Sequence, residues 1–205
     1  MNNSARRLIW TVAVVCTLGA AGLIAPSTSI ARATAVSDTS HVGLNTCHPS
    51  ALSQPFARWL DYADYELAPG GDFESSTWKL TGAAKLLAGS EPYGVTGARG
   101  SQSLSLPAGS SAKSPLTCVD ATSPSIRFFI AGKGSVAVKV IDGSSVVPAG
   151  VAAAGGAWAP TPVILTGAGA LGASSGGTAQ VSVAFTGLSG SPRVDDVFVD
   201  PWNRS

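Results

Sequence analysis

SIRFFIAGKGSVAVKVI, residues 125–141, decides the fold class of this chain. Every second position in its two halves is apolar: Ile126, Phe128 and Ile130, then Val136, Val138 and Val140. A period of two is typical of strands that bury one face. The two halves are separated by Gly132 and Gly134, and this spacing predicts a hairpin connection between two strands.

The same alternation recurs on both sides of this stretch. It is found at Leu104 and Leu106 and again over 181–185, while Asp142-Gly143 predicts a hairpin turn directly after the opening stretch. Clusters of Gly, Pro and Ser separate these runs at short intervals. This arrangement is typical of antiparallel sandwiches and barrels, so the sequence predicts an all-β fold over residues 70–205.

Residues 47–69 follow a different pattern. Phe56, Trp59, Ala63 and Leu67 are spaced as on the apolar side of a helix, which predicts a short helical segment of one or two turns. We expect this N-terminal segment, residues 47–69, to pack on the sandwich. The preceding residues 34–46 are polar and without pattern, and they are interpreted as a flexible arm.

The first 33 residues have the layout of a secretion signal. Arg6 and Arg7 precede an uncharged apolar run over 8–25, and Ala31-Arg32-Ala33 offers a small-x-small cleavage site. The alternative is a retained membrane anchor, because eighteen apolar residues are just enough to span a bilayer. We favour cleavage and therefore predict a secreted, extracellular protein with no membrane contact after signal cleavage.

The composition of residues 34–205 limits the classes of partner that the chain is expected to bind. Three of the 13 basic residues and none of the 12 acidic ones lie in the first 33, which leaves a net charge of −2 for residues 34–205. This balance argues against a nucleic-acid partner. Two cysteines remain, Cys47 and Cys118, and an even count in an exported protein predicts one disulfide between them rather than two free thiols.

No catalytic constellation stands out, so no catalytic residue and no enzyme activity are predicted. His41 and His48 both lie before the β pattern, and the chain lacks a GxSxG nucleophile motif. A glycan hydrolase needs two carboxylates across a cleft, and Asp72, Glu74 and Asp196 keep that alternative open.

Two short motifs at opposite ends of the β region carry a family resemblance. Gly71-Asp72-Phe73-Glu74 followed by Trp78 resembles the opening strand of galactose-binding-like jelly-roll domains, and 193–199, with its Asp195-Asp196 pair, resembles their closing strand. This group includes many carbohydrate-binding modules. The chain is also similar to secreted proteins of high-GC Gram-positive (actinobacterial) bacteria. The resemblance implies an antiparallel two-sheet jelly-roll sandwich.

In such modules a structural calcium ion commonly lies between the first and last strands. Carried over, the resemblance implies Glu74 and Asp195 as ligands of a structural Ca²⁺. Asp195 shares its strand face with Val197 and Val199, so a buried carboxylate is expected there, and burial favours a metal or a charged partner. The alternatives are a salt bridge to Lys79 or Arg193, or an exposed strand end.

The resemblance favours a non-catalytic carbohydrate-binding module whose partner is a polysaccharide or a cell-wall glycan. Sugars stack on aromatic rings, and the candidate ligand-binding residues are Tyr93, Trp158 and Trp78. Of these, Tyr93 lies in a Pro-Tyr-Gly turn and is the ring most expected to be exposed. The alternative is a structural or protein-interaction protein of the cell envelope surface.

Overall fold

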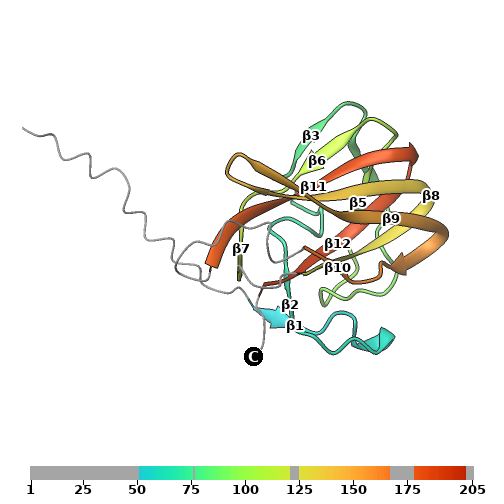
Figure 1. Ribbon diagram of the computed structural model, residues 1–205. Coiled ribbons are helices and arrows are strands. Elements are labelled where there is room, and N and C mark those ends of the chain that lie inside the picture. The colour runs from blue at the N-terminus through green and yellow to red at the C-terminus, as the bar shows by residue number, and fades with distance from the viewer. Residues whose placement is uncertain (1–50, 76, 121–124, 167–177, 202–205) are drawn as a thin grey trace, which may run out of the picture. The chain divides into compact units, whose positions relative to one another are not determined.

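Twelve strands and one 3₁₀ turn make up the part of the chain that the computed structural model describes, residues 51–75, 77–120, 125–166 and 178–201 (Figure 1). The elements are β1 (Leu52–Ser53), η1 (Ala57–Trp59), β2 (Tyr65–Leu67), β3 (Lys79–Thr81), β4 (Lys85–Ala88), β5 (Gln102–Ser105), β6 (Ser111–Lys113), β7 (Thr117–Asp120), β8 (Ser125–Asp142), β9 (Ser145–Pro160), β10 (Ile164–Leu165), β11 (Thr178–Gly190) and β12 (Arg193–Asp200). Among these residues no helix has the length and apolar character that a membrane crossing requires.

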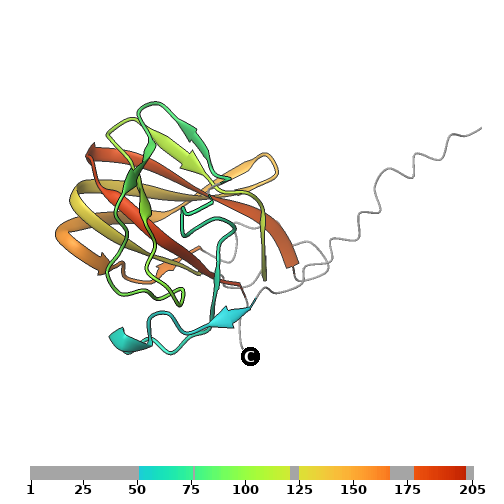
Figure 2. The ribbon, with the colours of Figure 1, turned by 180° about the vertical axis from the view of Figure 1, so that it is seen from behind.

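Every strand pairing is antiparallel, and the main path through the sheet runs β1-β2-β12-β8-β11-β6-β3. The long strands β8, β9 and β11 are strongly curved, so the sheet folds over itself around a common core (Figures 1 and 2). One layer contains β4, β5, β12 and the first half of β8, and the other contains β3, β6, β11 and the second half of β8. The predicted antiparallel β-sandwich of the jelly-roll type is confirmed.

Strand β8 connects the two layers without a turn, so the hairpin predicted at Gly132 and Gly134 is wrong. Its residues up to Ala131 pair with β12, and those from Gly134 onward pair with β11. The glycines adopt φ values of 86° and 119°, and the register against β9 shifts between Ile130 and Gly132. The glycines therefore bend one strand instead of ending it.

The hairpin predicted at Asp142 is confirmed. Asp142 pairs with Ser145 across a two-residue turn, and β9 runs back along β8 as far as Phe129, which pairs with Pro160. Gly143 in this turn has a φ of 55°, the left-handed conformation that such tight turns require.

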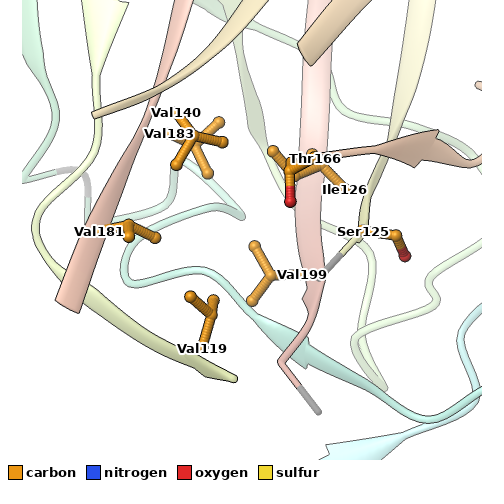
Figure 3. Close-up of a pocket in the computed structure, with 8 residues that line it drawn as sticks. All are labelled: Val119, Ser125, Ile126, Val140, Thr166, Val181, Val183 and Val199. Atoms are coloured by element: carbon orange, nitrogen blue, oxygen red, sulfur yellow. The ribbon is translucent and has the colours of Figure 1, made fainter. Parts of the chain in front are cut away.

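The core lies between the two layers. Phe128 and Phe185 contact edge to face with ring centroids 4.9 Å apart, and Trp78 stacks on Phe185 at 5.5 Å. The same core contains a cavity of about 10 Å³, room for one water molecule at most and too small for a sugar (Figure 3). It is lined by Val119, Ser125, Ile126, Val140, Thr166, Val181, Val183 and Val199.

The predicted N-terminal helix is a single 3₁₀ turn. Leu60 ends it with a left-handed φ of 62°, and the chain then extends into β2, which pairs with β12. Asp61 explains the break, because its carboxylate accepts hydrogen bonds from the Ala63 N–H and the Tyr65 hydroxyl and forms a salt bridge with Arg127 on β8. These contacts favour an extended chain over further helical turns.

Several sequence predictions lie outside the described residues. They concern the signal over 1–33, the arm over 34–46, His41, His48 and Cys47. Cys118 lies on β7. Because its predicted disulfide partner, Cys47, lies outside the described residues, the disulfide stays a prediction.

Candidate functional site

Three aromatic side chains from distant parts of the sequence meet at the edge of a small second core. Trp59 lies in η1, Tyr93 in the loop between β4 and β5, and Trp158 near the end of β9. All three are partly buried and pack against the buried rings of Phe56, Tyr65, Phe129 and Phe198. We call Trp59, Tyr93 and Trp158 the aromatic cluster.

Direct contacts hold the aromatic cluster together. The Trp59 and Tyr93 rings meet edge to face at 4.9 Å between centroids, and the Tyr93 ring lies 5.6 Å from that of Phe129. The Tyr93 hydroxyl donates to the Trp158 carbonyl oxygen at 2.9 Å. The Tyr93 ring is thus held by contacts with Trp59 and Phe129, and all three residues of the cluster stay partly exposed, as contact with a sugar requires.

Two guanidinium groups flank the cluster. The Arg58 guanidinium lies 5.2 Å from the Tyr93 ring centroid and 5.8 Å from that of Trp59. The Arg193 guanidinium lies 5.7 Å from the Trp158 ring and donates to Ser103 Oγ and to the Ala88 carbonyl. Arg193 therefore connects β4 and β5, the strands on either side of the Tyr93 loop. The exposed Arg58 places hydrogen-bond donors beside the rings.

The loop that carries Tyr93 is built around one buried carboxylate. Glu91 is 1% exposed, and its oxygens accept the backbone N–H groups of Tyr93, Gly94 and Val95. The N–H of Glu91 itself donates to Asp195 Oδ2 at 2.8 Å. The conformation of the Tyr93 loop is therefore determined by carboxylates inside the protein.

Asp195 and Asp196 lie on β12 beneath this loop and are both buried. Asp196 has a left-handed φ of 44°, where the pairing with β8 shifts register between Asp195 and Phe198. Burial raises the pKa of Asp195 to about 6. Burial, followed by the charges of Asp195 and Glu91, raises the pKa of Asp196 still further. Three buried carboxyl groups, those of Glu91, Asp195 and Asp196, therefore lie close together under the loop.

The predicted calcium ligands Glu74 and Asp195 occupy different surroundings. Exposed Glu74 accepts the Ser101 hydroxyl and the N–H groups of Ser101 and Gln102, and these bonds, the Ser101 hydroxyl foremost, lower its pKa. Asp195 accepts the N–H groups of Glu91 and Asp196. The structure contains no hydrogen bond or salt bridge from Asp195 to Lys79 or Arg193 within its described residues.

Gly100 lies close both to the Glu74 carboxylate and to Ser90, the hydrogen-bond partner of Asp195. A Cβ atom placed on Gly100 would lie 2.7 Å from Glu74 Oε1 and 2.8 Å from Ser90 Oγ, and Ser90 also hydrogen-bonds Asp195. These hard oxygens suit calcium. In the described part of the chain, however, no three His, Cys, Asp or Glu side chains are grouped to hold a metal, so an ion here needs hydroxyl or carbonyl oxygens as well.

The structure separates the three aromatic residues predicted to bind ligand. Tyr93 and Trp158 come together in the aromatic cluster, whereas Trp78 is 6% exposed and belongs to the main core. Its ring stacks on Phe185, and its Nε1 donates to the Pro69 carbonyl at 3.0 Å. A ring covered in this way has no free face for a sugar, so Trp78 is a packing residue.

Sequence reasoning missed other members of the site. Trp59 was expected on the apolar side of the N-terminal segment, Arg193 was considered only as a partner of Asp195, and nothing pointed to Arg58 or Glu91. The only available signal was the turn sequence at 91–94, where an acidic residue precedes Pro-Tyr-Gly and is suited to accept the turn's N–H groups. Long-range contacts such as that between Tyr93 and Trp158 left no local signal.

No protein-family model and no curated protein matches this chain. Solved structures with a similar arrangement of strands include TmCBM61 in complex with β-1,4-galactotriose, at 20% identity and a TM-score of 0.39, covering 63% of this chain and 94% of that one. A second is the Clostridium thermocellum xylanase 10B structure, which contains CBM22-1 and GH10 modules with xylohexaose, at 14% identity and a TM-score of 0.44. It covers 68% of this chain, which spans only 27% of that protein.

An enzyme is also among these structures. The Stig cyclase Fisc from Fischerella sp. TAU has 9% identity and a TM-score of 0.44, and the match covers 66% of this chain and 96% of that one. At these sequence identities the likeness is one of fold alone.

Proposed function

We propose that this chain is a secreted, non-catalytic carbohydrate-binding module that holds a sugar on the aromatic cluster. The observation that carries the proposal is the hydrogen bond from the Tyr93 hydroxyl to the backbone carbonyl of Trp158, which joins two segments 65 positions apart that each carry a half-buried ring. Rings fixed in this way offer apolar faces at little entropic cost on binding. Arg58 adds donors for sugar hydroxyl groups beside them.

The site is suited to binding rather than to bond cleavage. The carboxyl groups beneath the Tyr93 loop, those of Glu91, Asp195 and Asp196, are buried and engaged in hydrogen bonds that shape the loop and β12. A glycoside hydrolase instead presents two carboxyl groups to its substrate across an open cleft. The buried carboxylates therefore support a role in positioning the Tyr93 loop.

The polysaccharide partner is tested by retention of the secreted protein on insoluble cellulose, xylan, chitin, β-glucan and peptidoglycan. We expect retention on at least one of these glycans and release by the matching soluble sugar. Retention on none of them, with capture of a protein from the cell envelope, would overturn the proposal in favour of an interaction protein. Release of reducing ends from a retained glycan would overturn its non-catalytic part.

Secretion and the disulfide belong to the same proposal. Intact mass and amino-terminal sequencing of protein from the culture medium are expected to show a chain that begins at or near Thr34. Alkylation without reductant is expected to leave Cys47 and Cys118 unlabelled. Full-length chain in the membrane fraction, or labelling of both thiols in the native protein, would contradict these two points.

We further propose a structural calcium ion held by Glu74 and Asp195. The concentration of carboxylates at Asp195, Asp196 and Glu91 supports a cation near β12, because their mutual repulsion already raises the pKa of Asp196, although burial has the larger effect. The ion would supply positive charge where these side chains are packed together, and Ser90 Oγ, bonded to Asp195, offers a further oxygen.

A further inference from the structure

A row of lysines crosses the second layer of the sandwich, away from the aromatic cluster. Lys79 on β3 pairs with Lys113 on β6, Lys113 pairs with Ala184 on β11, and Ala184 pairs with Lys139 on β8. Residues paired directly across antiparallel strands point to the same side of the sheet. Ala184 lies between Val183 and Phe185, which face the core, so this row faces outward.

The geometry of the lysine row follows from the spacing of strands. Neighbouring strands lie about 4.8 Å apart, so three strand spacings place Lys79 and Lys139 about 14 Å apart at the backbone, with Lys113 between them. Lys79 and Lys113 are exposed, and Lys139 is half-buried. The three lysine side chains therefore start from a line of backbone positions across the strands, on the outward face of the sheet.

Among the residues that the structure describes, no acidic side chain forms a salt bridge with this line. None of the three lysines forms a salt bridge with another described residue. They line a shallow hollow of about 340 Å³, and none of the described residues around the hollow is Asp or Glu. Lys79 and Lys113 are also directly opposite each other, and like charges in that position destabilise a sheet. The fold thus keeps an unfavourable pair that an anionic ligand would relieve.

A parallel row of hydroxyl groups runs beside the lysines. Thr81 on β3 pairs with Ser111 on β6, and Ser111 pairs with Thr186 on β11. The Thr81 and Ser111 hydroxyls are 2.5 Å apart and hydrogen-bonded, and all three side chains line the same hollow. Positive charges and hydroxyl groups therefore lie side by side along one direction of the sheet.

We propose that this face, defined by Lys79, Lys113 and Lys139, binds an anionic polysaccharide, a glycan chain that carries carboxylate, sulfate or phosphate groups. The lysine row matches a line of negative charges, and the row of Thr81, Ser111 and Thr186 matches the free hydroxyls of a sugar chain. The surface is separate from the aromatic cluster, so the proposal goes beyond the site described above and does not depend on it.

The chemistry of the face favours a glycan over a nucleic acid. Proteins that bind single strands stack the bases on exposed aromatic rings. Of the described residues that line this hollow, only Phe185 is aromatic, and it is fully buried. The charge is also supplied by lysine alone, and the hollow is open and shallow, which suits an extended chain lying across the strands.

The test compares two double variants with the same change in net charge. Lys79→Gln/Lys113→Gln removes two charges of the row, and Lys85→Gln/Lys133→Gln removes two exposed charges from β4 and from the bend of β8. Binding is measured by affinity electrophoresis in gels that contain polygalacturonate, dextran sulfate or neutral dextran. A further gel contains a teichoic-acid polymer, which tests phosphate as the anionic group.

We expect wild-type protein to be retarded by at least one anionic polymer and not by neutral dextran, with retardation that weakens as salt is added. Lys79→Gln/Lys113→Gln should weaken the apparent affinity by roughly tenfold or more, a loss of about 1.4 kcal/mol for each factor of ten. The control double variant should change it by less than about twofold. Which polymer binds identifies the anionic group.

Four results would overturn the proposal. They are no retardation by any anionic polymer, equal retardation by neutral dextran, equal losses in the two double variants, or tighter binding of a single-stranded oligonucleotide than of every anionic glycan. Misfolding is excluded by thermal melting, because removing the opposed Lys79–Lys113 pair should leave stability unchanged or raised. Tyr93→Ala should retain anionic binding, so failure here is distinguishable from failure of the aromatic cluster.

Discussion

The backbone N–H of Glu91 donates to Asp195 Oδ2 at 2.8 Å, although 104 positions separate the two residues. This bond ties the Tyr93 loop to the last strand inside the protein. The Glu91 carboxylate then accepts the N–H groups of Tyr93, Gly94 and Val95. The position of an aromatic ring proposed to contact sugar is therefore set by two carboxylates that are themselves buried.

Replacing Asp195 should destabilise the fold and disorder the Tyr93 loop together. Asp195→Ala leaves the buried N–H groups of Glu91 and Asp196 without acceptors, which should lower the free energy of unfolding by about 2 kcal/mol. Asp195→Asn keeps one acceptor oxygen and should lose less. Urea denaturation measures both variants, and an Asp195→Ala protein as stable as wild type would show that this bond does not hold the loop.

The buried acids should make stability depend on pH in an unusual direction. The pKa of Asp195 rises from its ordinary value of 3.8 to about 6 on burial, and that of Asp196 rises further. The folded state then binds these protons more tightly than the unfolded state, so their contribution is present at low pH and is lost as pH rises from about 4 towards 8.

This contribution is measured in the presence of a chelator, so that metal binding does not interfere. The free energy of unfolding of Asp196→Asn should fall less steeply between pH 4 and 8 than that of wild type. Equal slopes for the two proteins would mean that Asp196 titrates normally in the folded state.

A structural calcium ion should be visible in melting experiments. An ion that binds only the folded state at one hundred times its dissociation constant adds about 2.7 kcal/mol to the free energy of unfolding. The melting temperature should therefore fall in chelator and recover with calcium, and Glu74→Gln should reduce the difference. Identical melting in chelator and calcium, with no metal found by elemental analysis, would exclude the ion.

The bend in β8 should depend on Gly134. This residue has a φ of 119°, and a Cβ atom there would lie 1.9 Å from the Ser189 carbonyl oxygen on β11. Gly134→Ala should therefore destabilise the protein by more than about 1 kcal/mol. Gly143→Ala is the comparison, since its added Cβ meets no atom within 4 Å and only the left-handed φ opposes it. Equal stability losses would show that β8 and β11 approach less closely than described.

The all-β fold followed from the sequence because strand alternation is a local property. Val136, Val138 and Val140 alternate with outward residues whatever their strand pairs with, and Asp142-Gly143 suits a tight turn on its own. The glycines at 132 and 134 allowed either a turn or a bend, and the choice depends on pairing with β12 and β11. The spacing of residues in the sequence does not specify which strands pair.

The candidate site was less accessible to sequence reasoning. Tyr93 was singled out by its Pro-Tyr-Gly turn, and Trp158 by its aromatic character, but their contact arises from folding. Trp78 has the same aromatic character and lies in the core, because its ring, just before β3, stacks on Phe185. Whether a given ring is buried depends on which layer covers it, and that information lies in the tertiary structure.

The most direct test of the sugar-binding site compares Tyr93→Ala with Tyr62→Ala. Tyr62 is 62% exposed and lies outside the aromatic cluster, so it controls for the loss of an exposed tyrosine ring. Dissociation constants are measured by depletion on the insoluble glycan that retains the wild-type protein. We predict that Tyr93→Ala weakens binding about tenfold, equivalent to one lost contact of about 1.4 kcal/mol, and that Tyr62→Ala leaves it unchanged. Equal affinities of wild type and a folded Tyr93→Ala protein would contradict the assignment of the aromatic cluster.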